Sequence, residues 1–75
     1  MIYLFGAEWC ANCKMVKPML ANIEYQYIDV DSDDGVYLTG KYGIRSLPTL
    51  LNTETLDRFS GVPRNVADLK EKIGL

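Results

Sequence analysis

Two cysteines carry most of the chemistry that this sequence can offer. Cys10 and Cys13 are its only cysteines, Ala11 and Asn12 separate them, and the chain contains no histidine. Catalysis by histidine, cysteine–histidine nucleophile pairs and zinc sites that use imidazole are therefore excluded. Thiols at this spacing can still exchange disulfides, because one thiolate can attack a disulfide and the second thiol can complete the exchange.

The place of the pair in the chain predicts a separate role for each thiol. Cys10 stands where a predicted helix begins, and the unpaired N–H groups and the macrodipole of a helix start favour a thiolate. Cys13 lies one turn further on the same helix face, closer to the core. We therefore expect an accessible Cys10 to attack the substrate and a protected Cys13 to resolve the product.

Three simpler interpretations of the pair compete with this one. A purely structural disulfide would close a very short loop, for which chain entropy contributes only about 2 kcal/mol. A zinc site would lack its other ligands, because the chain has no further cysteine and no histidine. Two small buried hydrophobic residues are the third interpretation, which the polar Asn12 between the cysteines disfavours.

An acidic run could suggest a metal site. Asp29, Asp31 and Asp33 resemble the first ligands of a calcium loop, but Asp34 stands where that loop needs glycine and Gly40 where it needs a bidentate glutamate. We interpret the run as a solvated strand end followed by a helix cap. The sequence thus predicts no bound metal.

The cysteines follow the first strand of an alternating pattern. The apolar run from Met1 to Phe5 predicts a strand buried on both faces. Apolar spacing predicts a helix from near Cys10 to near Glu24, kinked at Pro18. Residues 25–30 predict a second strand, parallel to the first because a helix connects the two.

The second half of the chain predicts a helix, a hairpin and a closing helix. A short helix is capped near Ser32 and ends at Gly43. Two strands over residues 47–51 and 56–59 are joined by a short polar link, which favours an antiparallel hairpin. An amphipathic helix follows Asn65. The predicted fold class is α/β, in the order β-α-β-α-β-β-α, with one mixed sheet flanked by helices.

Composition limits the class of protein. The 75 residues are 48% hydrophobic and 24% charged, which predicts one folded domain over residues 1–75. The net charge of -2, with scattered basic residues, disfavours nucleic-acid and membrane-surface partners. No apolar run is long enough for a bilayer, and the first residues lack a charged signal region. We expect a cytoplasmic monomer.

Three segments resemble the thioredoxin/glutaredoxin superfamily. Residues 7–15, Ala-Glu-Trp-Cys-Ala-Asn-Cys-Lys-Met, resemble the thioredoxin active-site segment, with Ala-Asn in place of Gly-Pro, and Pro18 falls where thioredoxins carry a helix proline. Residues 41–50, Lys-Tyr-Gly-Ile-Arg-Ser-Leu-Pro-Thr-Leu, are similar to the segment that carries their cis-proline. Gly61 is similar to the glycine that lines their substrate groove. The chain resembles a glutaredoxin-sized protein with a thioredoxin-like Trp-Cys-Ala-Asn-Cys-Lys active site.

This resemblance implies a fold, an activity and a site. The fold is a minimal thioredoxin fold, with strand order 2-1-3-4 and three helices. The activity is that of a dithiol–disulfide oxidoreductase, an enzyme that reduces protein disulfides through Cys10 and Cys13. The Leu47–Pro48 bond is expected to be cis, and the residues implied in substrate binding are Trp9, Ala11, Asn12, Leu47, Pro48 and Gly61.

Two departures from the family pattern concern the resolving thiol. Leu4 stands where thioredoxins bury an aspartate, and Tyr27 stands where they pair that aspartate with a lysine. The carboxylate that usually takes up the proton of the resolving thiol is therefore absent. We expect Cys13 to be buried in apolar surroundings, and we expect the release of substrate to accelerate with pH.

The resemblance also implies partners. Protein disulfides are the expected substrates, with ribonucleotide reductase as one client. The electron donor is either an enzyme like thioredoxin reductase or glutathione, in a role in electron transport and cell redox homeostasis. No cofactor beyond the redox-active Cys10–Cys13 disulfide is expected. The alternatives are a glutathione-dependent glutaredoxin, although residues 60–65 differ from the usual glutathione-binding turn, and a non-enzymatic thioredoxin-fold binding module.

Overall fold

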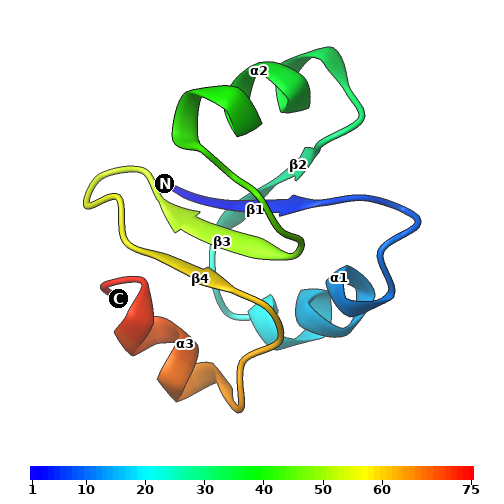
Figure 1. The fold of residues 1–75 in the computed structure, drawn as a ribbon. Coiled ribbons are helices and arrows are strands. Elements are labelled where there is room, and N and C mark those ends of the chain that lie inside the picture. Colours follow the sequence, from blue (N-terminus) through cyan, green and yellow to red (C-terminus); the bar gives the residue numbers. More distant parts are fainter.

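A four-stranded mixed sheet forms the centre of the protein. The computed structural model describes residues 1–75. The elements in chain order are β1 (Ile2–Gly6), α1 (Ala11–Val16), the 3-10 helix η1 (Lys17–Leu20), β2 (Tyr25–Asp29), α2 (Asp33–Tyr42), β3 (Thr49–Asn52), β4 (Arg58–Ser60) and α3 (Val66–Lys72). The strand order is β2-β1-β3-β4, with β1 parallel to β2, and both features were predicted (Figure 1). Strand β1 runs antiparallel to β3.

Helices cover both faces of the sheet, so β1 is buried on both sides. Figure 1 shows α2 on one face and α1 and α3 on the other. Because side chains alternate along a strand, Ile2 and Leu4 join the larger core with residues of α1, η1 and α3. Phe5 joins a smaller core, against which Leu38 and Tyr42 of α2 pack. The prediction of a strand buried on both faces is confirmed.

The helix predicted from Cys10 to Glu24 is divided and ends earlier. An α-helix runs to Val16, and the chain continues as a 3-10 helix that contains Pro18 and ends at Leu20. Proline has no N–H to donate to the preceding turn, and its ring clashes with the carbonyl four residues earlier. The predicted kink therefore takes the form of a change of helix type. The prediction was wrong about the end of the helix, because the segment after Leu20 is a turn.

The hairpin strands are shifted toward the C-terminus from the predicted ranges 47–51 and 56–59. The strands are Thr49–Asn52 and Arg58–Ser60, paired antiparallel. The Asn52 side chain accepts a hydrogen bond from the Glu54 N–H at 3.0 Å and donates one to the Ile73 carbonyl at 2.9 Å. Asn52 thereby starts the turn between β3 and β4 and connects it to the end of α3. Because β4 begins only at Arg58, the segment between the two strands is longer than predicted.

The caps predicted for α2 and α3 are present. Ser32 Oγ accepts a hydrogen bond from the Gly35 N–H at 2.9 Å, and Gly43 ends α2 in the left-handed conformation with φ 66°. Asn65 Oδ1 accepts a hydrogen bond from the Asp68 N–H at 2.7 Å at the start of α3. None of the helices combines the length and the apolar character needed to cross a membrane.

Two glycines of α2 provide a test of how that helix packs. A Cβ on Gly35 would overlap the Asp29 carbonyl group at the end of β2, whereas a Cβ on Gly40 would meet nothing within 4 Å. Gly35→Ala should lower the free energy of unfolding by about 1–3 kcal/mol, because the backbone must shift. Gly40→Ala should raise it by about 0.5–1 kcal/mol, because alanine favours a helix interior. Urea denaturation measures both, and equal stabilities would contradict this packing.

Candidate active site

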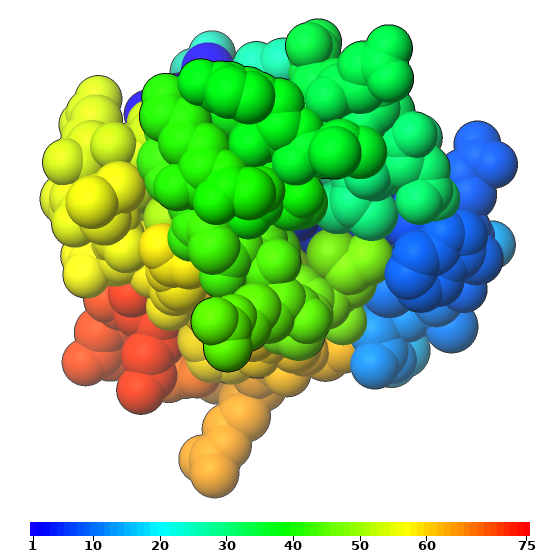
Figure 2. Space-filling model, turned by 45° about the horizontal axis from the view of Figure 1, so that its top comes forward, coloured from blue at the N-terminus to red at the C-terminus, as the bar shows by residue number.

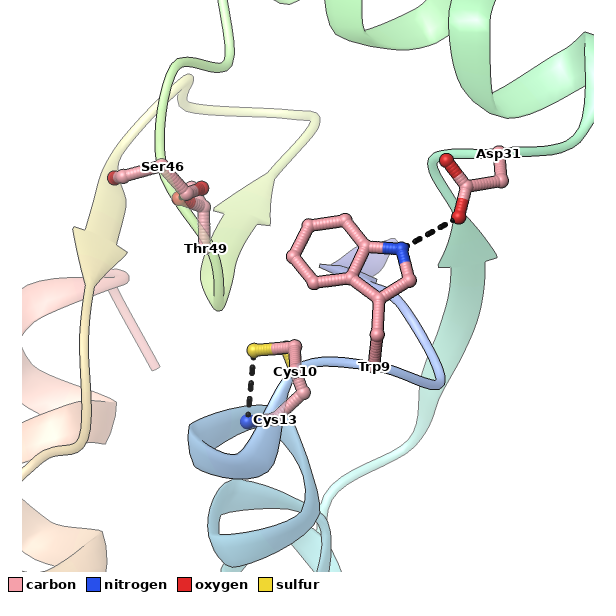
Figure 3. The surroundings of a disulfide bond; sticks show 6 residues. All are labelled: Trp9, Cys10, Cys13, Asp31, Ser46 and Thr49. Atoms are coloured by element: carbon pink, nitrogen blue, oxygen red, sulfur yellow. Dashed lines mark hydrogen bonds between the residues drawn. A yellow bond between two sulfur atoms is a disulfide. The ribbon is translucent and has the colours of Figure 1, made fainter.

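Cys10 lies at the end of the turn between β1 and α1, Cys13 lies in α1, and the two are joined in a disulfide whose surroundings Figure 3 shows. Cys10 is the N-cap of α1, and its Sγ accepts a hydrogen bond from the Cys13 N–H at 3.2 Å. The Cys10 N–H donates to the Ala7 carbonyl at 3.1 Å, which fixes the turn. Cys10 is 9% exposed and Cys13 is 1% exposed. The structure thus places Cys10 nearer the surface, although less accessible than the sequence suggested.

Trp9 projects from the same turn and is held by an aspartate from a different strand end. Its indole Nε1–H donates a hydrogen bond of 2.8 Å to Asp31 Oδ2, while the side chain remains 70% exposed (Figure 3). Sequence analysis assigned Asp31 only to a solvated strand end. A signal was present, because the carboxyl ends of parallel strands meet at one edge of a sheet and Trp9 and Asp31 follow two such strands.

A groove of about 440 Å³ opens beside Cys10. Trp9 and Cys10 form part of its lining, together with residues 44–47, Val30 and Thr39. Figure 2 shows the blue segment that carries the cysteines beside the green of α2 and the yellow-green segment that follows it. The groove is therefore built from the start of α1, the end of β2, and the helix and loop that lead to β3.

The predicted loop residues lie next to the cysteines. Leu47 lines the groove and packs against the cluster of Ala7, Cys10 and Cys13, Pro48 is fully buried, and the bond between Leu47 and Pro48 is cis. The Gly61 N–H donates to the Pro48 carbonyl at 2.8 Å. Thr49 Oγ1 donates to the Ser46 carbonyl at 2.7 Å and so fixes the loop (Figure 3). Neither the N–H nor the carbonyl of Leu47 takes part in a backbone hydrogen bond, so both remain available to another chain.

The other predicted site residues take different positions. Ala11 and Asn12 are exposed in the first turn of α1 and do not line the groove. Gly61 contacts the loop through Pro48 and likewise does not line it. Sequence analysis missed Ile44 and Arg45, which do line it. A sequence signal for both residues exists, because they lie within residues 41–50, the segment that resembles the thioredoxin cis-proline segment. From that segment only Leu47 and Pro48 were predicted as site residues.

An apolar side chain stands at the position where the family pattern has a buried acid. Leu4 is completely buried in the larger core, and Tyr27 is its register partner on β2. Burial raises the pKa of the Tyr27 hydroxyl, and the negative charges of Asp29, Glu8 and Asp31 add to the rise. A second cleft, lined by Ala7, Glu8, Lys14 and Lys17, reaches Cys13.

Comparison with known proteins agrees with this geometry. Thioredoxin 1 of Synechococcus elongatus is 42% identical over 53 residues, which are 63% of this chain and 50% of that protein. The thioredoxin of Pyropia yezoensis is 38% identical over 64 residues, which are 77% of this chain and 60% of that protein. The chain therefore spans half to three-fifths of the length of these relatives.

Solved structures and the family model extend the match to nearly the whole chain. The crystal structure of Malassezia sympodialis thioredoxin superposes with a TM-score of 0.74 at 25% identity, covering 97% of this chain and 70% of that one. Thioredoxin O2 from Arabidopsis thaliana in its oxidized state gives a TM-score of 0.64 at 25% identity, covering 93% and 68%. The thioredoxin family model matches residues 1–74, the stretch that contains the cysteine pair and the loop beside it, and this protein belongs to the thioredoxin family.

Proposed function

We propose that this protein is a dithiol–disulfide oxidoreductase of the thioredoxin type, which reduces protein disulfides through Cys10 and Cys13. The observation that carries the proposal is the Cys10–Cys13 disulfide at the side of a groove, with Cys10 the nearer of the two to the surface. Membership of the thioredoxin family supports the same activity. The three simpler interpretations of the cysteine pair do not account for the groove.

In the first step, the reduced protein attacks its substrate. The Cys10 thiolate attacks one sulfur of a substrate disulfide, a mixed disulfide forms, and the other substrate sulfur leaves as a thiolate. The Cys13 N–H points at Cys10 Sγ from 3.2 Å. Because a hydrogen bond to the charged form favours that form, this N–H stabilises the attacking thiolate.

In the second step, Cys13 releases the substrate. Cys13 attacks the Cys10 sulfur, the Cys10–Cys13 bond forms, and the bond from Cys10 to the substrate breaks. Two electrons have then passed from the protein dithiol to the substrate. Either an enzyme like thioredoxin reductase or glutathione restores the dithiol, and no other cofactor takes part.

The groove favours an extended polypeptide as substrate. The free N–H and carbonyl of Leu47 can pair with the backbone on one side of a substrate cysteine, as in other cases of strand addition. Trp9, held by Asp31, offers an apolar surface on the opposite wall. Protein disulfides in unstructured segments fit this arrangement. Ribonucleotide reductase is one candidate client, within a cytoplasmic role in electron transport and cell redox homeostasis.

Alkylation tests the roles of the two thiols. In the reduced protein, brief treatment with iodoacetamide near neutral pH should label Cys10 and leave Cys13 protected, because Cys10 is nearer the surface and accepts the N–H bond. Peptide mass mapping identifies the labelled residue. Preferential labelling of Cys13 would reverse the assignment of roles.

Serine variants test whether the protein is an enzyme. Cys10→Ser should reduce the rate of insulin disulfide reduction to the uncatalysed level, because the attacking sulfur is gone. Cys13→Ser should still attack and should accumulate a mixed disulfide, visible as a mass increase that dithiothreitol reverses. If the double serine variant retained the biological function, the protein would be a binding module. Assays with thioredoxin reductase and with glutathione plus glutathione reductase identify the electron donor.

The hydrogen bond between Trp9 and Asp31 provides a test of substrate binding. Asp31→Ala removes the acceptor and frees the indole, so KM for a protein disulfide should rise between about twofold and tenfold. Asp31→Asn keeps an acceptor oxygen and should restore most of the affinity. Asp33→Ala is the matched control, because Asp33 lies in the same acidic run but does not contact Trp9 through a hydrogen bond. Equal KM values for the Asp31→Ala and Asp33→Ala variants would show that the hydrogen bond between Trp9 and Asp31 does not contribute to substrate binding.

A further inference from the structure

We propose that the Tyr27 hydroxyl donates a hydrogen bond to the Cys13 thiolate and thereby promotes the step that releases substrate. This inference rests on the proposed function and deepens it, because it names the group that acts where the family's buried carboxylate is missing. It makes Tyr27 of β2, which does not line the groove beside Cys10, a further residue of the active site.

The Tyr27 hydroxyl and Cys13 Sγ both border the space above Gly6. A Cβ built on Gly6 would lie 3.1 Å from Cys13 Sγ, 3.1 Å from Tyr27 Cε1 and 3.3 Å from the Tyr27 hydroxyl oxygen. The sulfur and the phenol therefore approach the same point above the backbone of Gly6. A side chain on residue 6 would displace Cys13 Sγ or the Tyr27 phenol from this point. The close approach of both groups to the backbone therefore requires glycine at the end of β1.

The hydroxyl is free to donate. The Tyr27 hydroxyl takes part in none of the side-chain hydrogen bonds. Because every fully buried side-chain oxygen or nitrogen has a hydrogen-bond partner, this hydroxyl is not fully buried and lies at the solvent boundary. In the oxidised protein, Cys13 Sγ is bonded to Cys10 and carries no charge. A charge develops on this sulfur only when the disulfide is open, and a hydroxyl binds a charged acceptor about twice as strongly as a neutral one.

The surroundings keep Tyr27 protonated while Cys13 ionises. Burial and the carboxylates of Asp29, Glu8 and Asp31 raise the pKa of the phenol, so Tyr27 acts as a donor and does not take up the proton of the thiol. The Lys17 ammonium lies over the Tyr27 ring at 4.1 Å from its centroid. A cation in that position holds the ring and also favours a nearby thiolate.

The charged groups around the cysteines come from several elements. Glu8 in the β1–α1 turn, Lys14 on α1 and Lys17 on η1 line the cleft that reaches Cys13, and Arg45 in the loop before β3 lines the groove on the Cys10 side. The two lysines favour the thiolate and Glu8 opposes it. The cleft connects Cys13 with solvent and shares no lining residue with the groove beside Cys10.

Release of the substrate is a thiol–disulfide exchange between Cys13 and the mixed disulfide on Cys10. The Cys13 thiol gives its proton to water in the cleft, and the resulting thiolate, held by the Tyr27 hydroxyl, attacks the Cys10 sulfur. The Cys10–Cys13 bond forms while the Cys10–substrate bond breaks. The substrate sulfur leaves with the electron pair of the broken bond and takes a proton from water.

Ionisation of Cys13 tests the inference without a substrate. In a Cys10→Ser background, the thiolate absorbance of Cys13 is followed against pH. Adding Tyr27→Phe, which removes only the hydroxyl, should move the titration midpoint upward by about one pH unit, a tenfold loss of thiolate below the midpoint. Tyr25→Phe is the matched control, because Tyr25 lies on the same strand and packs against the same core but pairs with Ile2, away from Gly6. It should leave the midpoint unchanged.

A second measurement uses the unmutated protein and so does not depend on the folding of a variant. Coupling between two titrating groups is reciprocal, so reduction of the disulfide should move the Tyr27 titration, observed by NMR of its ring, to higher pH. An unmoved Cys13 midpoint in a folded Tyr27→Phe variant, or identical Tyr27 titrations in the two redox states, would overturn the inference.

The outcomes separate this inference from the proposed function. If the protein fails to reduce insulin but both titrations shift as expected, the proposed function is wrong and the contact between Tyr27 and Cys13 stands. If insulin is reduced and neither titration shifts, the function stands and the role of Tyr27 is wrong. In the active chain, Tyr27→Phe should slow the release of the mixed disulfide about tenfold at neutral pH, and the rate should recover at alkaline pH.

Discussion

The rest of the structure depends on the burial of β1 between two strands and two layers of helices. Ile2 and Leu4 supply one core and Phe5 the other, so this one strand anchors α1 and α3 on one face and α2 on the opposite face. In a chain of 75 residues the apolar surface that can be buried is limited, and β1 contributes to both cores. The end of β1 is consequently the most firmly placed point from which a reactive turn can start.

The active site forms where three strand termini meet. The parallel pairing of β1 and β2 brings their carboxyl ends together, and Trp9 and Asp31 follow those ends. The antiparallel pairing of β1 and β3 places Thr49 opposite Phe5, which brings the loop before β3 to the same edge. The cysteine turn, the aspartate and the loop therefore come from three parts of the chain, and the register of the sheet alone makes them neighbours.

Leu4 shows a compromise between stability and chemistry. A buried carboxylate at this position would be costly unless it were paired, and a leucine adds apolar burial to a small core instead. Under the proposed function, the proton of the resolving thiol is therefore handled from the edge of the sheet. There the phenol of Tyr27, the ammonium of Lys17 and a cleft to solvent lie together. The polar groups near Cys13 thus lie at the boundary of the core and not inside it, so their charges remain hydrated.

The sequence by itself determined the order of the elements, the α/β class, the caps of α2 and α3, and the cysteine pair at the start of a helix. These features depend on residues close together in the chain, such as Ser32 with Gly35, or on local apolar spacing. Resemblance added the strand order and the cis bond before Pro48. The predicted end of the helix after Pro18 was wrong. Ile23, in the turn that follows Leu20, faces the core and therefore extends the apolar spacing of a helix.

Only the tertiary structure decided the contacts between distant segments. Asn52 bonds to the end of α3, Asp31 anchors Trp9, and Gly6 lets Tyr27 approach Cys13. Each of these contacts depends on which residues face each other across the sheet, and a shift of one residue in register would turn every side chain of a strand to the other face. The apolar pattern of a strand indicates which side chains face the core, but not which residue of the neighbouring strand each one pairs with. That register is set by how the strands and helices pack together, and the surroundings of the cysteines follow from it.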